Sequence, residues 1–146
     1  MYPNISRFDI GFLFVAFAVG SGGCELRHHY DVSGNVKYNG ARLRKPDGQI
    51  VFVGTDGEQV TAAIDLDGNY WATNVSSGQN AVAVYYPNPK AQKAQPVRSK
   101  HGRTLPPAES PFLTPYVYGV AETSQLRVTV EKETVFDVNL TGPVIR

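Results

Sequence analysis

Apolar and polar residues alternate over most of the chain after residue 29, with the period of two that is typical of half-buried β-strands. In the first such segment Val32, Val36 and Tyr38 fall on one face, and Lys37 falls on the other. Comparable segments occupy residues 49–53, 59–66, 69–73, 80–86, 126–130 and 136–140. With residues 30–38 they make seven predicted strands, so the pattern predicts an all-β fold.

Turn-forming residues separate the first five of these segments. The turn residues are Asn39-Gly40, Pro46-Asp47-Gly48, Asp56-Gly57, Asp67-Gly68 and Ser77-Gly78. Connections this short join antiparallel strands and leave no room for the crossover helix that a parallel pair of consecutive strands needs. The prediction is a single seven-stranded antiparallel β-sandwich over residues 31–141, with meander or Greek-key connections.

The alternation also predicts which side chains point inward. Val60, Ala62, Ile64 and Leu66 share one face of their segment, and Tyr70 falls in the same phase as the core. A buried tyrosine needs a partner for its hydroxyl group. We therefore expect Tyr70 to be a core residue that is hydrogen-bonded to the backbone.

Residues 87–115 break the rhythm with seven prolines and predict a long loop. Its first part, residues 87–103, contains five basic residues and no acidic residue. The basic residues are Lys90, Lys93, Arg98, Lys100 and Arg103. They could form a docking site for an anionic glycan, a lipid headgroup or a protein partner. Alternatively they are solvated charges that prevent strands from pairing edge to edge.

Two aromatic residues, Trp71 and Tyr85, are out of phase with the core positions of their segments. If their strands pair, the two rings would lie together on an outer sheet face and could bind a sugar or a partner. The alternative is that a long loop, with Tyr116 and Tyr118, covers them.

The N-terminal segment has the layout of a secretory signal, with an apolar run at residues 10–19 followed by small residues. The run is shorter than the roughly 20 residues needed to cross a bilayer. Cys24 follows Gly22 and Gly23 directly, an arrangement that resembles the lipobox of bacterial lipoproteins, in which the cysteine is acylated. We expect a signal peptide at 1–23, lipid attachment at Cys24 and a tether at 24–30. The alternatives are an ordinary cleaved signal with an incidental cysteine, or a retained N-terminal helix.

Composition restricts the chemistry further. The net charge is +1, too small for binding nucleic acid through the overall field of the protein, and the single cysteine excludes an internal disulfide. We expect the adjacent residues His28 and His29 to be solvated and not to bind a metal. We expect a turn, and not a calcium-binding loop, at Asp65, Asp67 and Asn69. Since no motif supplies an activated nucleophile, we expect no catalysis, cofactor or metal.

Two stretches resemble the carboxypeptidase regulatory-like, or transthyretin-like, β-sandwich domain of small bacterial lipoproteins. The first contains "VSGNV" at 32–36, "DLDGNY" at 65–70 and Gly78 before a valine strand. The second is the tail "TPYVYGVAETSQLRVTVEKETVFDVNL" at 114–140. The resemblance implies a sandwich fold and an exported, anchored protein. It does not extend to the related hydroxyisourate hydrolases, whose terminal tyrosine-arginine-glycine-serine motif is replaced here by "TGPVIR".

Together these features predict a non-catalytic, lipid-anchored cell-envelope protein that binds an envelope protein or a glycan. The alternative is a secreted carbohydrate-binding module that uses Trp71 and Tyr85.

Overall fold

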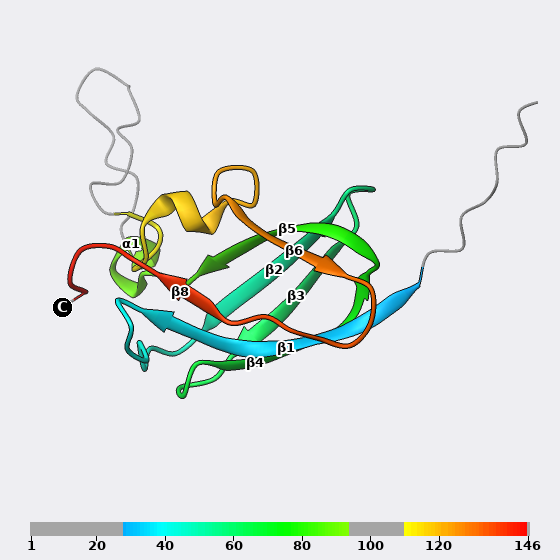
Figure 1. Ribbon diagram of the computed structural model, residues 1–146. Coiled ribbons are helices and arrows are strands. Elements are labelled where there is room, and N and C mark those ends of the chain that lie inside the picture. Colours follow the sequence, from blue (N-terminus) through cyan, green and yellow to red (C-terminus); the bar gives the residue numbers. More distant parts are fainter. Residues whose placement is uncertain (1–27, 94–109, 146) are drawn as a thin grey trace, which may run out of the picture.

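The computed structural model describes residues 28–93 and 110–145 and is mostly β-structure. The strands are β1 (His29–Tyr38), β2 (Gly48–Gly54), β3 (Gln59–Ile64), β4 (Asn69–Ser76), β5 (Gly78–Tyr85), β6 (Leu126–Val130), β7 (Thr134–Val135) and β8 (Val138–Leu140). A short helix α1 (Pro89–Lys93) and a 3₁₀ turn η1 (Tyr116–Gly119) complete the elements of these residues (Figure 1).

The strands form one sheet that curls until it is nearly barrel-shaped. Its order is β6-β5-β2-β3-β4-β1-β7, with β8 also paired to β1. Because β2, β3 and β4 are successive neighbours and β5 returns beside β2, the connection is a Greek key. β3 and β4 share a single paired position, Ile64 with Tyr70, so the sheet bends at this hairpin.

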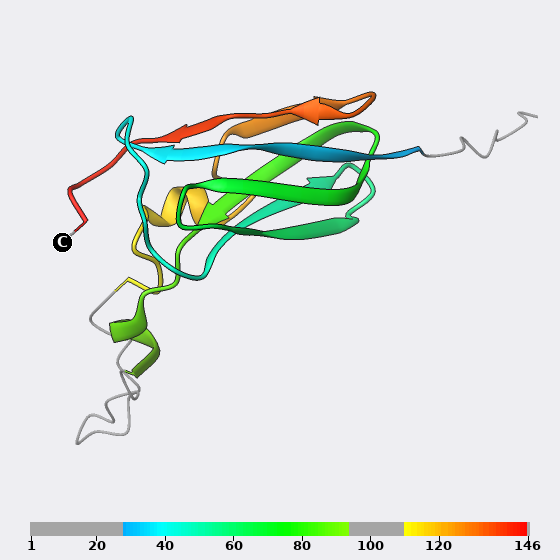
Figure 2. The ribbon, with the colours of Figure 1, turned by 90° about the horizontal axis from the view of Figure 1, so that it is seen from below.

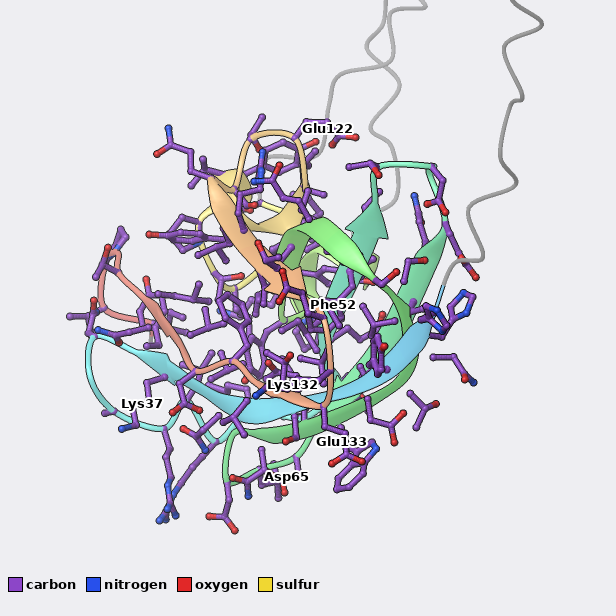
Figure 3. All side chains as sticks on the ribbon, turned by 45° about the vertical axis from the view of Figure 1, so that its right-hand side comes forward. Lys37, Phe52, Asp65, Glu122, Lys132 and Glu133 are labelled. Atoms are coloured by element: carbon purple, nitrogen blue, oxygen red, sulfur yellow. The ribbon has the colours of Figure 1, made fainter. Side chains whose placement is uncertain are left out.

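The inward face of the sheet forms one hydrophobic core, in which Ile50, Phe52 and Val84 are almost fully buried. Figure 3 shows Phe52 inside the curl and Asp65, Glu122 and Glu133 at its periphery. The predicted core positions Ala62 and Ile64 are buried. The prediction for Leu66 was wrong. It lies in the turn between β3 and β4, beyond the strand alternation, and is 59% exposed.

β4 carries one extra residue relative to β1. Tyr30 pairs with Val75 and Val32 with Ala72, so residues 73 and 74 together oppose one residue of β1. Asn74 takes a positive φ of 61° there, and both residues are exposed. This β-bulge returns Val75 to the core, and bulges of this kind re-aim neighbouring side chains.

The last strand departs from the antiparallel prediction. β7 and β8 both pair with β1 in parallel, Ser33 with Val135 and Val36 with Val138. The expected strand at 136–140 is thus the second half of a strand that is interrupted at Phe136 and Asp137. After β6 the chain crosses to the other edge of the curled sheet. β7 and β8 therefore run beside β1 and in the same direction as β1.

The interruption has a specific cause. In an unbroken parallel ladder at this register, the Asn35 amide would donate to the Phe136 carbonyl. Instead the Asn35 amide donates to Asp137 Oδ1 at 2.8 Å, and the Phe136 carbonyl accepts a hydrogen bond from the Tyr70 hydroxyl at 2.5 Å. The Phe136 amide still donates to the Ser33 carbonyl. The predicted core position and backbone bond of Tyr70 are confirmed, and burial raises the pKa of its hydroxyl.

Gly34 makes this arrangement possible. A Cβ atom at this position would lie 2.1 Å from the Phe136 carbonyl oxygen and 2.9 Å from the Tyr70 hydroxyl. Any side chain on residue 34 would therefore displace the carbonyl that Tyr70 holds.

The two ends of the curled sheet differ in the chain segments that lie there. β1 begins at one end of the curled sheet, and the segment after β8 lies at the opposite end, as Figures 1 and 2 both show. The helix α1 also lies at that far end. Ten residues of extended strand separate the ends of β1, or about 30 Å.

We expect Tyr70→Phe to lower the free energy of unfolding by about 1–3 kcal/mol, because the Phe136 carbonyl would lose its partner in a buried setting. Urea denaturation measures this. Tyr116→Phe is the matched control, since Tyr116 is 59% exposed, and it should change stability by less than about 0.5 kcal/mol. Equal effects of the two substitutions would contradict the role assigned to Tyr70.

Candidate functional site

A groove on the outer face of β4, β1 and β7 brings together an exposed tryptophan and two carboxylates. Ser33 pairs with Trp71 on one side and with Val135 on the other, so a small residue lies between two large ones. The backbones of Trp71 and Val135 are two strand spacings apart, about 9–10 Å. The space between them has a volume of about 180 Å³ and is lined by Asp31, Ser33, Trp71, Glu133, Thr134 and Val135.

The walls of the groove are exposed to solvent. Trp71 is 65% exposed and Val135 is 75% exposed. In both cases the strand alternation explains the exposure, because Tyr70 and Phe136 next to them turn toward the interior. The β-bulge at 73–74 lies directly beyond Trp71 in β4.

The polar groups of the groove are mostly hydrogen-bond acceptors. The Trp71 indole Nε1 donates to Asp31 Oδ2 at 3.2 Å, and the Thr134 hydroxyl donates to the Lys132 carbonyl at 2.7 Å. Neither Asp31 nor Glu133 forms an ion pair within residues 28–93 and 110–145, where the pairs are His29 with Glu58 and Arg42 with Asp67. The site therefore presents unneutralised negative charge beside an aromatic face.

Tyr85 does not share this site. β4 neighbours β3 and β1, whereas β5 neighbours β2 and β6, so the two strands do not pair. The Tyr85 hydroxyl donates to Gln49 Oε1 at 2.5 Å across the β5–β2 ladder. The condition for a common platform of Trp71 and Tyr85, that their strands pair, is not met because the sheet order separates β4 from β5.

Loop cover is confirmed for Tyr85 alone. The ring of Phe112 lies 5.0 Å from that of Tyr85, and Tyr116 stacks on Phe112 at 5.7 Å. The hydroxyl of Tyr118 contacts the Thr141 hydroxyl at 3.2 Å. Trp71 stays open.

A larger cavity of about 500 Å³ lies at the far end of the barrel. Its lining is Lys45, Pro46, Asp47, Pro87, Asn88, Pro89, Lys90, Phe112, Leu113 and Ile145. Of the predicted basic set, Lys90 therefore lies beside a cavity. Lys93 is in α1, but its side chain is outside the described part of the chain, as are Arg98, Lys100, Arg103 and Cys24.

The described ends of the predicted 87–115 loop contain short regular elements. It begins with α1, and Pro87 forms an isolated bridge with Phe112. Next to it the C-terminal segment is held by Asn39, whose amide group exchanges two hydrogen bonds with Gly142. The Tyr38 hydroxyl donates to the Pro143 carbonyl at 2.7 Å, and burial, with a smaller contribution from Tyr118, raises the pKa of Tyr38.

The acidic turn between β3 and β4 is a structural turn. Asp65 Oδ1 accepts hydrogen bonds from the amides of Asp67 and Asn69, and these bonds, led by that from Asn69, lower the pKa of Asp65. Asp67 Oδ1 is paired with Arg42 at 3.0 Å. These oxygens already have protein partners, which accords with the expectation of a turn.

Two other titratable groups have shifted pKa values. At the end where the N-terminal chain enters, Ser76 and then His29 hydrogen-bond to Glu58 and lower its pKa. In the core, burial raises the pKa of Tyr86 to about 12. Neither group touches the Trp71 groove.

Sequence reasoning singled out Trp71 but missed Asp31, Glu133 and Val135. The alternation around residues 30–38 does place Asp31 on the outer face. However, its proximity to Trp71 depends on which strand pairs with β1. Val135 could be found only from the parallel register of β7, which no local pattern indicates.

Comparison with known proteins found no matching family model, no similar curated protein and no similar solved structure. Among the described residues no helix is long and apolar enough to cross a membrane. In the same residues no group of three or more metal-ligating side chains occurs.

We expect Trp71→Ala to change the free energy of unfolding by less than about 0.5 kcal/mol, because the side chain is largely exposed. Tyr85→Ala should cost on the order of 2 kcal/mol, since it removes the Gln49 bond and the Phe112 contact. Thermal and urea unfolding compare the two variants. A larger loss for Trp71→Ala would mean that its ring is structural.

We also expect stability to fall on acidification. A carboxyl group whose folded pKa is lowered stabilises the fold above its unfolded value, and the stabilisation disappears as the pH falls through the folded value. For Asp65 this window lies below its ordinary pKa of 3.8. Asp65→Asn should flatten the stability profile between about pH 4 and pH 2 in urea titrations. Tyr116→Phe, which changes no carboxyl group, is the control and should leave the profile unchanged.

Proposed function

We propose that this protein is a non-catalytic, lipid-anchored binding module of the cell envelope, built on a transthyretin-like β-sandwich. Two features support the fold part of the proposal. The sheet bends between β3 and β4, where only one position is paired. A bend at this place would divide the strands into the two facing layers of a sandwich. The Greek-key order is also typical of sandwiches.

The proposed lipid anchor is supported by the arrangement of features at the two ends of the curled sheet. The chain enters β1 at one end, and the 500 Å³ cavity with Lys45 and Lys90 lies at the other. A lipid on Cys24 would fix the entry end toward the membrane. It would leave the far end about 30 Å farther out, where a partner can reach it.

The secreted carbohydrate-binding module is the weaker alternative. It relied on Trp71 and Tyr85 as a joint stacking platform, and the two rings occupy different parts of the sheet. A single exposed tryptophan leaves only one stacking position for a sugar ring.

The anchor is tested by intact-mass analysis of the protein purified from a bacterial membrane fraction. We expect a mature chain that begins at Cys24 and carries the added mass of acyl chains. Cys24→Ala should abolish both the added mass and the membrane association. Tyr116→Phe serves as the processed control. An unmodified Cys24, or a chain that still carries residues 1–23, would refute the anchor.

A further inference from the structure

We infer that the groove between Trp71 and Val135 binds an arginine side chain of a protein partner. The inference deepens the proposed binding function, because it assigns a ligand class to a surface of the same module. It does not depend on whether Cys24 is acylated.

The shape of the groove suits a flat group. Ser33 forms a small floor between the indole of Trp71 and the methyl groups of Val135. The width of about 9–10 Å between the two backbones leaves room for one planar layer once both side chains are in place. A guanidinium group is planar and stacks on indole faces, where it gains a cation–π interaction.

The charges of the groove complement a cation. Asp31 and Glu133 line it, and neither is ion-paired within the described residues. The hydrogen bond from Trp71 Nε1 uses Asp31 Oδ2 and fixes the ring beside the carboxylate. Asp31 Oδ1 has no partner in the described part of the chain and is left to accept from a ligand.

The balance of donors and acceptors separates arginine from a sugar. A guanidinium group is a pure donor, and the groove offers mainly acceptors. A sugar ring presents hydroxyl groups that need donors as well. The Trp71 Nε1 and Thr134 donors are already used within the protein, so among the side chains that line the groove only Ser33 remains as a donor. A lysine ammonium group would be attracted by the two carboxylates, but it is not planar and would not fill the flat space between Trp71 and Val135.

Trp71 is the only tryptophan of the chain, so its fluorescence reports on the groove directly. The experiment titrates the full-length protein, in non-ionic detergent, with a capped pentapeptide that has one central arginine among glycines. We expect saturable quenching of the emission that weakens as the salt concentration rises. The same peptide with citrulline, which is neutral and of equal shape, should bind about tenfold more weakly.

Substitutions locate the effect. Asp31→Asn and Glu133→Gln each remove one negative charge and should each weaken binding about fivefold. The matched control is Glu122→Gln, which removes an exposed carboxylate outside the groove lining and should leave the affinity unchanged. Circular dichroism establishes that each variant is folded.

Three results would overturn the inference. One is equal binding of the arginine and citrulline peptides, and another is no quenching by the arginine peptide in the folded protein. The third is stronger quenching by a neutral oligosaccharide such as cellohexaose or chitohexaose, which would assign the groove to a glycan. A failure here combined with acylated Cys24 would leave the anchor intact, so the two proposals are distinguishable.

Discussion

The hydrogen bond from the Tyr70 hydroxyl to the Phe136 carbonyl is the interaction on which the arrangement of the C-terminal strand beside β1 depends. It joins β4 to the C-terminal strand across β1, over the bare backbone of Gly34. The carbonyl is taken from the β1 ladder to make this bond, and Asp137 replaces it as the acceptor for the Asn35 amide. One buried side chain thus connects three strands, and both the Asn35 amide and the Phe136 carbonyl keep a hydrogen-bond partner.

The same bond determines where the candidate site lies. Because side chains alternate along a strand, burying Tyr70 turns its neighbour Trp71 outward, and drawing Phe136 inward turns Val135 outward. Both walls of the groove are therefore consequences of the contact between Tyr70 and Phe136. The parallel register that this contact accompanies then places Val135 on the same row as Ser33 and Trp71.

Local features of the sequence were sufficient for the strands and turns but not for their neighbours. Period-two alternation located the core positions Val32, Val84 and Leu140, and the turn dipeptides fell where the backbone takes a positive φ, as at Gly57 and Gly68. Alternation states only which face a residue occupies. It does not state which strand lies beside it, since many pairings bury the same apolar face.

Two differences between the sequence analysis and the structure illustrate this limit. Trp71 and Tyr85 both pointed outward as predicted, yet the Greek key put β1 beside β4 and β2 beside β5. The final strand was located, but its parallel direction follows from a crossover between sheet edges that depends on the whole fold. Asp31, which lies within a predicted strand, became a site residue only through its hydrogen bond to Trp71.

A net charge near zero conceals a separation of charge over the surface. The Trp71 groove carries Asp31 and Glu133 on the flank of the barrel, and Asp31 is the third residue of β1, close to where the chain enters. Lys45 and Lys90 line the cavity at the far end, with Asp47 as its one acidic residue. At physiological ionic strength charges farther apart than about 8 Å are largely screened from each other. The two surfaces are separated by most of the length of β1, so each attracts ligands by its own local charge. Binding of the proposed arginine side chain on the flank would therefore be electrostatically independent of any ligand at the far end.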